Sequence, residues 1–333
     1  AHISKTRRCD GGTNRRRVNT ALPHPPSLTR RHFIGTVGLA ATSVATRLNS
    51  APSSLTAMPT LACNTYPWFT FLRREDRDFN TELARVVADM AATGFTSIEP
   101  NLEDRASVDA HVPLLAETGL TMESAYMNSE LHDASSAAAS IDHVVSVAAY
   151  ALETFGTRML VTNPKPISWG GPENKTETQI RTQGRALDQL GAALRAEGIT
   201  LAYHNHDSEL RLGAREFHHM LVSTDPANVK FCLDAHWVYR GCGNSSLALF
   251  DTLELYADRI VELHLRQSTG GVWDEAFAAE SDIDYQRLFT FLRERDIHPL
   301  LTMEQAVEDD STQVHDSVYA HRASCDALRA MLT

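Results

Sequence analysis

Four polar residues recur at near-regular spacing in the second half of the chain: His204, Asp234, His264 and Glu304, separated by 30, 30 and 40 residues. Together, two imidazoles and two carboxylates can hold one divalent ion and leave positions open for substrate oxygens. Such a mixed nitrogen and oxygen set suits Mn²⁺, Mg²⁺, Co²⁺, Fe²⁺ or Zn²⁺. Alone, each has a simpler interpretation, as a surface or core histidine or a helix-capping aspartate. Their common polarity and spacing favour one metal site.

Each of the four residues lies at or next to the end of a short stretch in which large apolar residues alternate with smaller or polar ones, at 201–204, 231–234, 261–265 and 301–304. Successive side chains of a strand point to opposite faces. The large residues, such as Tyr203 and Leu233, are therefore predicted to pack on outer helices. The four polar residues then point inward, above a layer formed by Ala202, Cys232, Glu262 and Thr302.

From residue 61 onward, short apolar strands alternate with longer helical patterns, which indicates parallel βα units. Eight strands are predicted, at 61–64, 97–99, 121–125, 158–161, 200–203, 230–233, 260–265 and 299–303; helical stretches include 81–93, 141–155, 176–197, 284–295 and 312–332. Residues 61–333 provide about 34 residues per unit, which predicts an α/β fold with a single (β/α)8 TIM barrel. An open doubly wound sheet needs a glycine-rich phosphate loop after its first strand, and Asn64-Thr65-Tyr66-Pro67-Trp68 is unlike one. In a barrel, the C-terminal strand ends meet at one mouth, where chemistry is carried out.

These strand ends resemble those of a known family. Tyr203-His204-Asn205-His206-Asp207, Leu233-Asp234, Glu262-Leu263-His264-Leu265 and Met303-Glu304 are similar to motifs of the xylose isomerase-like TIM-barrel superfamily, the sugar phosphate isomerase/epimerase group. Ile98-Glu99-Pro100 is similar to its second strand. The resemblance implies that His204, Asp234, His264 and Glu304 are the ligands of one divalent metal that chelates adjacent substrate oxygens. Activities in the group include keto-sugar 3-epimerisation, dehydration and cleavage of 3-keto-glycosides.

The chain departs from the family pattern at informative positions. The 3-epimerases have a glutamate where His204 stands and use it with the last-strand glutamate as two opposed acid/bases. Many members follow the histidine of strand seven with Lys-Asp, whereas this chain has Arg266-Gln267. The family's histidine after strand six comes one position early here, at His236. Symmetric epimerisation therefore needs His206 or Glu99 as a substitute.

The expected chemistry begins with removal of a proton next to a carbonyl, because a divalent ion bound to a carbonyl and a neighbouring hydroxyl stabilises an enediolate. Reprotonation gives epimerisation, a proton shift gives aldose–ketose isomerisation, and loss of a β-substituent gives dehydration or glycoside cleavage. We therefore predict a metal-dependent sugar isomerase or epimerase, with a lyase or dehydratase acting on a keto-sugar or 3-keto-glycoside as the alternative. Glu304 is the first candidate for the base, His206 for moving a proton at the leaving oxygen, and Glu99 is a third candidate or a structural carboxylate.

Other residues near the strand ends suit a sugar ligand. Tyr66, Trp68, Trp237 and Trp273 can stack on a sugar ring or serve as core packing. Arg266 can bind a substrate hydroxyl or carboxylate, or pair with Glu262 instead. His236 completes the predicted substrate-binding set.

Charge is unevenly distributed: residues 1–60 have net charge +8 and residues 61–333 have −19. An acidic body repels phosphate backbones, so nucleic acid is not an expected partner and an endonuclease IV-like hydrolase is disfavoured. A non-catalytic sugar-binding barrel is a further alternative, but it would not need the intact ligand set. The five cysteines show no CxxC spacing, and those after the leader (Cys63, Cys232, Cys242 and Cys325) are expected to be free thiols. A small sugar is the predicted partner, and a homo-oligomer is left open.

Residues 1–60 are rich in Arg, Pro, Ser and Thr, and we expect them to be a largely disordered leader. Within them, Thr29-Arg30-Arg31-His32-Phe33-Ile34-Gly35 resembles a twin-arginine export signal, followed by a weakly apolar stretch. That stretch is much shorter than the roughly 20 residues of a membrane span. We therefore expect an exported, periplasmic protein without a membrane span. A cytoplasmic protein with a basic tail, or an organellar protein with a transit peptide, is the alternative.

Overall fold

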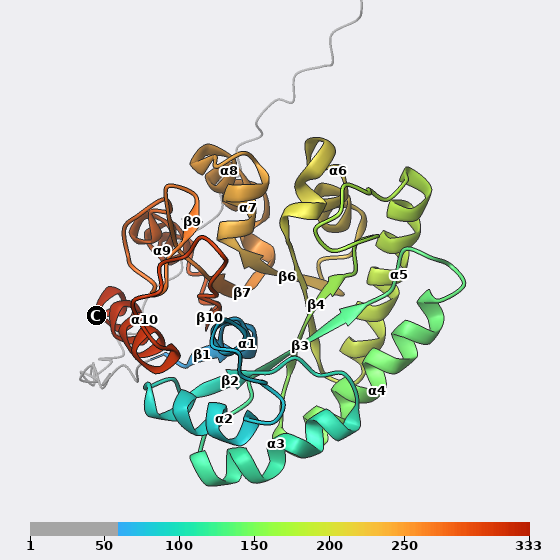
Figure 1. The fold of residues 1–333 in the computed structure, drawn as a ribbon. Helices are drawn as coiled ribbons and strands as arrows, with labels where there is room; N and C mark the ends of the chain where they lie inside the picture. The colour runs from blue at the N-terminus through green and yellow to red at the C-terminus, as the bar shows by residue number, and fades with distance from the viewer. Residues whose placement is uncertain (1–58) are drawn as a thin grey trace, which may run out of the picture. The chain divides into compact units, whose positions relative to one another are not determined.

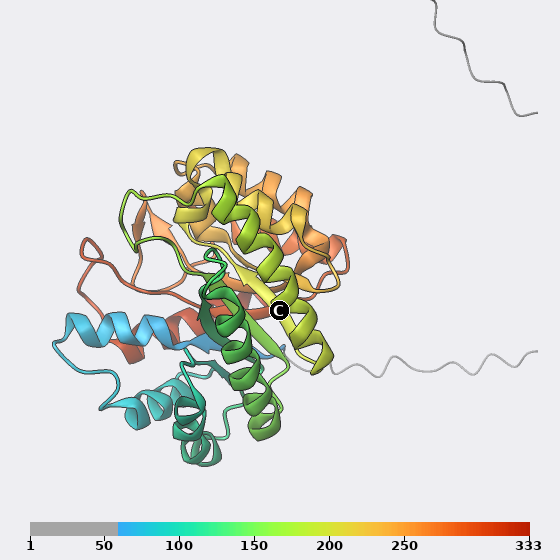
Figure 2. The same cartoon turned by 90° about the vertical axis from the view of Figure 1, so that its right-hand side faces the viewer.

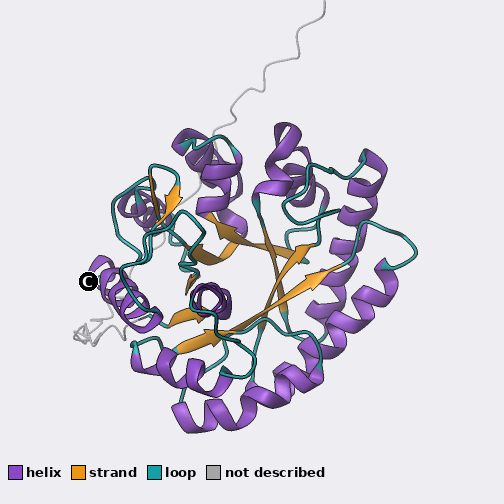
Figure 3. Ribbon diagram, in the orientation of Figure 1, coloured by secondary structure: helices purple, strands orange, loops and turns teal. Residues whose placement is uncertain are grey.

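The computed structural model describes residues 59–333. The predicted leader, with Arg30 and Arg31, lies almost entirely outside this range, so its predictions remain expectations. The described residues form the predicted α/β barrel, with strands inside and helices outside (Figures 1 and 3).

Eight parallel strands line the barrel in the order β2-β1-β10-β7-β6-β5-β4-β3. They are β1 (Leu61–Asn64), β2 (Ser97–Glu99), β3 (Ser124–Ser129), β4 (Met159–Pro164), β5 (Thr200–His204), β6 (Val229–Asp234), β7 (Ile260–Leu265) and β10 (Leu300–Met303). A small antiparallel pair, β8 (Ser268–Thr269) and β9 (Val272–Trp273), follows β7. All eight predicted barrel strands are present.

The barrel closes between β2 and β3 by isolated bridges. Ser97 is bridged to Thr121 and Asn101 to Tyr126, both in parallel orientation. The third strand was predicted at 121–125, but the continuous ladder with β4 begins at Ser124. That prediction was therefore wrong by about three residues, because the Leu120-Thr121-Met122 alternation belongs to the closing bridge.

Helices surround the strands. They are α1 (Thr65–Arg74), α2 (Leu83–Ala92), α3 (Arg105–Thr118), α4 (Ala137–Phe155), α5 (Glu177–Ala196), α6 (Asp207–Ser223), α7 (Ala235–Gly241), α8 (Ser246–Tyr256), η1 (Ala257–Arg259), α9 (Tyr285–Glu294) and α10 (Ser317–Leu332). Asp or Thr side chains cap several of them; for example, Thr176 accepts a hydrogen bond from Gln179 N at the start of α5. Across residues 59–333 no helix combines the length and apolar character needed to cross a bilayer.

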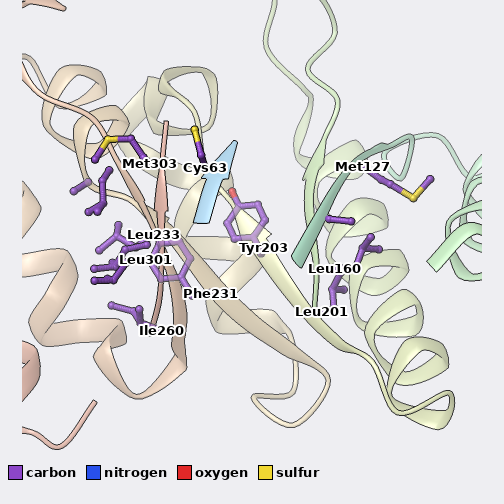
Figure 4. Packing of buried hydrophobic residues seen from close by; sticks show 14 of the residues in the cluster. Cys63, Met127, Leu160, Leu201, Tyr203, Phe231, Leu233, Ile260, Leu301 and Met303 are labelled. Atoms are coloured by element: carbon purple, nitrogen blue, oxygen red, sulfur yellow. The ribbon is translucent and has the colours of Figure 1, made fainter. Parts of the chain in front are cut away.

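The main hydrophobic core lies between the strands and the outer helices. The large alternating residues predicted to face outward belong to it, among them Leu201, Tyr203, Phe231, Leu233 and Met303 (Figure 4). A smaller cluster inside the barrel contains Tyr126, Val161, Ala202 and Cys232. The residues between these large ones, such as Ala202 and Cys232, therefore point into the barrel, as predicted.

The α1 helix begins directly after β1, where the Asn64 side chain accepts a hydrogen bond from Tyr66 N at 2.7 Å. Pro67 is tolerated because the first helical turn has no intrahelical acceptor for its missing N–H. Figure 2 shows α1 projecting on the side of the loops that follow β7 and β10. Tyr66 and Trp68 thus lie on a helix that the sequence analysis did not predict.

Trp68 packs within the fold and does not reach the barrel mouth. It is fully buried, and its ring stacks on His321 of α10 with centroids 4.2 Å apart. The His321 Nδ1–H donates to the Ser317 carbonyl at 2.7 Å, while its Nε2 is buried with no partner among residues 59–333. Burial lowers the pKa of His321 to about 4. The neutral ring is therefore required for this packing.

This histidine should make stability pH-dependent. The folded state disfavours the charged ring, so stability is present above the unfolded pKa of about 6.5 and is lost as pH falls towards 4. Between pH 7 and pH 5 the loss should be about 2 kcal/mol. His321→Gln should remove this part of the pH dependence in urea unfolding curves, whereas the exposed His298→Gln should not. Equal slopes in wild type and His321→Gln would show that His321 titrates alike in both states.

Candidate active site and metal centre

The four inward strand-end residues converge in one cluster. His204 ends β5, Asp234 ends β6, His264 is the penultimate residue of β7 and Glu304 directly follows β10. Each offers one ligand atom, and these atoms all lie within 4.8 Å of one another. All four side chains are buried, with Glu304 the most exposed at 5%. Four donors gathered this closely can surround one divalent ion.

Asp234 combines two roles. Its Oδ1 accepts a hydrogen bond from Trp237 N at 2.8 Å and so caps α7. Its Oδ2 is buried and has no partner within the described chain. Burial raises the pKa of Asp234 to about 7, despite the opposing charge of Arg266. An unpaired buried oxygen is costly, and a cation in the cluster would satisfy it.

His204 contributes a second unpaired atom. Its Nδ1 lies 3.8 Å from Cys232 Sγ, and its Nε2 is buried without a partner in residues 59–333. Burial, with His264 and His206 nearby, holds the pKa of His204 well below its usual value. A neutral imidazole with a free ring nitrogen is what a metal requires of histidine. The cluster therefore fits a divalent ion.

Glu304 links the cluster to a buried arginine. Its Oε2 lies 3.2 Å from His264 Nδ1 and 2.9 Å from Arg266 Nη2, and its carbonyl accepts from Arg266 Nε at 2.9 Å. Burial opposes ionisation of Glu304, but Arg266 and His264 outweigh it and hold its pKa well below the usual range. Arg266 thus pairs with Glu304, not with Glu262. Its Nη1 remains buried and unpaired with any described residue.

A second pair of carboxylates lies under the cluster. Glu99 Oε1 is 2.9 Å from His264 Nε2, and Glu99 also accepts from Asn64 Nδ2 at 2.6 Å. The Ser124 hydroxyl lies 3.0 Å from both Glu99 and Glu262, and Glu262 also accepts from Thr302. Glu99 is fully buried and does not line the cavity described below. Its position fits the alternative of a structural carboxylate, which here orients His264, and not the alternative of a base in contact with substrate.

Glu99 should therefore influence metal affinity. Glu99→Gln removes the negative charge beside His264 and is expected to weaken divalent-metal binding by about 10-fold or more. Titration of metal-free protein with Mn²⁺ measures the change. Glu123→Gln serves as a control: Glu123 is exposed and lies just before β3, so the dissociation constant of this variant should match wild type. An unchanged constant in Glu99→Gln would mean that other contacts orient His264.

A cavity of about 580 Å³ opens above the cluster. Of the four cluster residues, Glu304 alone is among its lining residues, so a ligand in the cavity meets the cluster through this carboxylate. His206, Arg266, Trp237 and Tyr66 also line it. His206 is the last residue of the Tyr203-His204-Asn205-His206 motif. Burial lowers its pKa to about 4, which leaves its ring neutral at pH 7.

Two predicted substrate contacts lie elsewhere. Trp68 packs on His321, as described above. His236 is fully buried, and its Nε2 is 2.9 Å from the Ser268 hydroxyl, behind the lining residues Trp237 and Trp273. Its placement one position early on α7 turns it away from the cavity.

The sequence analysis missed several lining residues. Asn64, Asn101 and Asn128 come from the β1, β2 and β3 side of the mouth, Arg240 from α7, and Trp169 from the loop between β4 and α5. The three asparagines continue the inward-facing positions of their strands, so the alternation of inward and outward residues could have identified them. Trp169 lies in an aperiodic loop, where the sequence gives no indication of direction.

The fold and the strand-end cluster agree with a family assignment. Residues 87–331 match the family model for the xylose isomerase-like TIM barrel. The chain belongs to this family. The match spans seven of the barrel's eight strands, including those that carry the cluster.

Solved structures share this barrel at low sequence identity. A sugar phosphate isomerase/epimerase from Parabacteroides distasonis is 18% identical over 86% of this chain and 99% of its own, with a TM-score of 0.63. D-allulose 3-epimerase from Methylomonas sp., in complex with D-allulose, is 16% identical over 82% and 97%, with a TM-score of 0.64. 3-Keto-D-glucoside 4-epimerase from E. coli is 14% identical over 82% and 99%, with a TM-score of 0.58. No curated protein matches the chain in sequence.

Proposed function

We propose that this chain is a divalent-metal-dependent isomerase or epimerase of a sugar. The observation that carries the proposal is the convergence of His204, Asp234, His264 and Glu304, with two buried atoms unpaired in the described chain, beneath a cavity that Glu304 lines. The family assignment supports it, as do the sugar epimerases among the solved structures with this fold.

In this mechanism the four cluster residues would hold the ion. When bound, it would supply positive charge beside a carbonyl and a neighbouring hydroxyl of the sugar, which makes the adjacent C–H more acidic. Glu304 is placed to take that proton, because it lines the cavity. Arg266 holds the Glu304 carboxylate at 2.9 Å and keeps it ionised.

His206 is the second proton carrier in the proposal. Its Nδ1 has no partner among the described residues, and it lines the same cavity as Glu304. It follows β5, whereas Glu304 follows β10, and β6 and β7 lie between these strands. Two proton carriers from different walls can serve opposite faces of one carbon, which inversion requires.

Elimination is the second candidate. At the position of His204, the resemblance implies that 3-epimerases have a glutamate. In this chain, Glu304 is therefore the one carboxylate of the cluster that lines the cavity. One base suffices to remove a proton and expel a β-substituent from a keto-sugar or 3-keto-glycoside. The elimination gives an unsaturated product, and no carbon has to be inverted.

Product analysis in D₂O tests the proposal. Mn²⁺-loaded protein is incubated with ketoses, aldoses and 3-keto-glucosides, and products are followed by NMR. A saturated isomer or epimer that takes up deuterium supports isomerisation, with His206→Ala abolishing the exchange. An unsaturated product or a released aglycone supports elimination instead. Absence of turnover across the panel, with metal bound, would refute the enzymatic function for these sugars.

We also propose export through the twin-arginine route, on the motif around Arg30 and Arg31. Replacing both arginines by lysine should retain the protein in the cytoplasm, because the pair is the recognised element of the signal. Cell fractionation with an activity-independent antibody readout measures this. Unchanged fractionation would refute the signal, and an organellar location would favour a transit peptide.

A further inference from the structure

The cavity is larger than one sugar ring requires. The twelve non-hydrogen atoms of a hexose fill at most about 360 Å³, even if each is given the liquid share of a water molecule, about 30 Å³. The cavity measures about 580 Å³. A single hexose on the cluster therefore leaves room for a substantial additional group.

The extra room is bounded by a continuous series of aromatic rings. Trp169 contacts His206 with ring centroids 5.1 Å apart, His206 lies 5.6 Å from Trp237, and Trp237 lies 5.4 Å from Trp273. All four residues line the cavity. They come from the segments that follow β4 to β7, whereas Asn64, Asn101 and Asn128 come from the β1 to β3 side, together with Tyr66 and Tyr126. Aromatic rings and side-chain amides around one cavity suit a carbohydrate, whose C–H faces stack and whose hydroxyls form hydrogen bonds.

Trp169 lies at the outer end of this series. His206 is 4.7 Å from the cluster residue His204 and 5.1 Å from Trp169, so Trp169 stands two ring-to-ring contacts from the cluster. A first ring bound at the cluster would occupy the inner contact, beside His206. A ring attached to it would then reach Trp169.

Trp169 is exposed and held in place. Its side chain is 56% exposed, the largest exposure among the cavity's tryptophans. Two residues later the Gly171 carbonyl accepts a hydrogen bond from Arg211 Nη1 at 2.6 Å, which ties this loop to the kink that interrupts α6 at residues 211–214. An exposed tryptophan fixed at a cavity rim leaves apolar area uncovered until a ligand covers it.

We propose that the outer part of this cavity is a subsite for a second ring and that Trp169 determines this specificity. The substrate class is then a keto-glycoside: a ring carbon carries the carbonyl that the proposed proton removal needs, and the anomeric oxygen carries a cyclic group, either a second sugar or an aryl group. This inference rests on the proposed sugar function and extends it to the size of the substrate.

Affinity measurements on matched ligands test the subsite. Mn²⁺-loaded wild type, Trp169→Ala and Leu255→Ala are titrated by calorimetry with methyl β-D-glucoside, 4-nitrophenyl β-D-glucoside and cellobiose, and with the D-galactose and D-xylose equivalents of the first two. Leu255 is 65% exposed on α8 and does not line the cavity, so it controls for loss of a surface apolar residue.

The expected result is that a two-ring ligand binds wild type and Leu255→Ala about tenfold more tightly than its methyl counterpart. In Trp169→Ala this advantage should fall below about threefold, while the methyl glycosides keep their affinity. Preference for 4-nitrophenyl glycosides over cellobiose would identify an aryl group, and the reverse a second sugar.

Equal affinity for one-ring and two-ring ligands, or an advantage that survives in Trp169→Ala, would overturn the subsite. If a monosaccharide is turned over in either of these two cases, the proposed function stands and the subsite alone is refuted. If no glycoside binds, the subsite is refuted. The proposed function is refuted separately, if none of the sugars in the turnover panel described above reacts.

Discussion

Asp234→Asn is expected to weaken divalent-metal binding at least 100-fold and to abolish turnover with it. The substitution keeps the shape of the side chain and the oxygen that caps α7 through Trp237 N. It removes the charge, and with it the buried Oδ2 that has no partner within residues 59–333. Elemental analysis after dialysis and Mn²⁺ titration both measure the loss.

Asp284→Asn provides a matched control. Asp284 caps α9 by accepting from Arg287 N at 2.9 Å, the same role that Asp234 has on α7, but it lies outside the cluster. Its metal affinity should equal that of wild type. Full metal occupancy in Asp234→Asn would instead show that the cluster is not the metal centre.

Stability separates loss of metal from loss of fold. Burial raises the pKa of Asp234 to about 7, so its ionised form is unfavourable in the metal-free protein. Removing that charge should leave the metal-free Tm of Asp234→Asn equal to or above that of metal-free wild type. Added Mn²⁺ should then raise the Tm of wild type but not that of the variant.

The barrel was predictable because its strands alternate strictly. In β5, β6, β7 and β10 every second residue is large and apolar, so one face must pack on helices and the other must point inward. A shift by one residue would place His204 or Asp234 in the hydrophobic layer. The convergence of the four cluster residues follows from this register and from closure of the sheet.

Residues outside that alternation were not predictable in the same way. Trp68 and Tyr66 are two residues apart on α1, so they point in different directions, one into the α1–α10 packing and the other into the cavity. On α7, His236 likewise points away from the cavity, whereas its neighbour Trp237 lines it. The role of Glu99 depends on its distance to His264, a contact between β2 and β7 that closure of the barrel creates.

Glu304→Gln is expected to reduce kcat at least 1,000-fold, since a positioned general base contributes about 10² to 10⁴ and Glu304 also faces the metal cluster. The amide keeps an oxygen near His264 but cannot accept a proton from the substrate. It also leaves Arg266 without the carboxylate that lies 2.9 Å from its Nη2. Loss of deuterium exchange at the substrate carbon should accompany the loss of turnover.

Metal titration decides which of the two roles dominates. If Glu304→Gln binds Mn²⁺ within about tenfold of wild type and still loses exchange, the carboxylate acts as the base. If saturating Mn²⁺ restores turnover, Glu304 serves as a ligand, and the base must be another residue lining the cavity, with His206 the next to test. Glu254→Gln, which alters an exposed pair with Arg295, should match wild type in both measurements. Wild-type turnover and exchange in Glu304→Gln would exclude Glu304 from both roles, because the amide cannot accept the proton and lacks the negative charge of the carboxylate ligand.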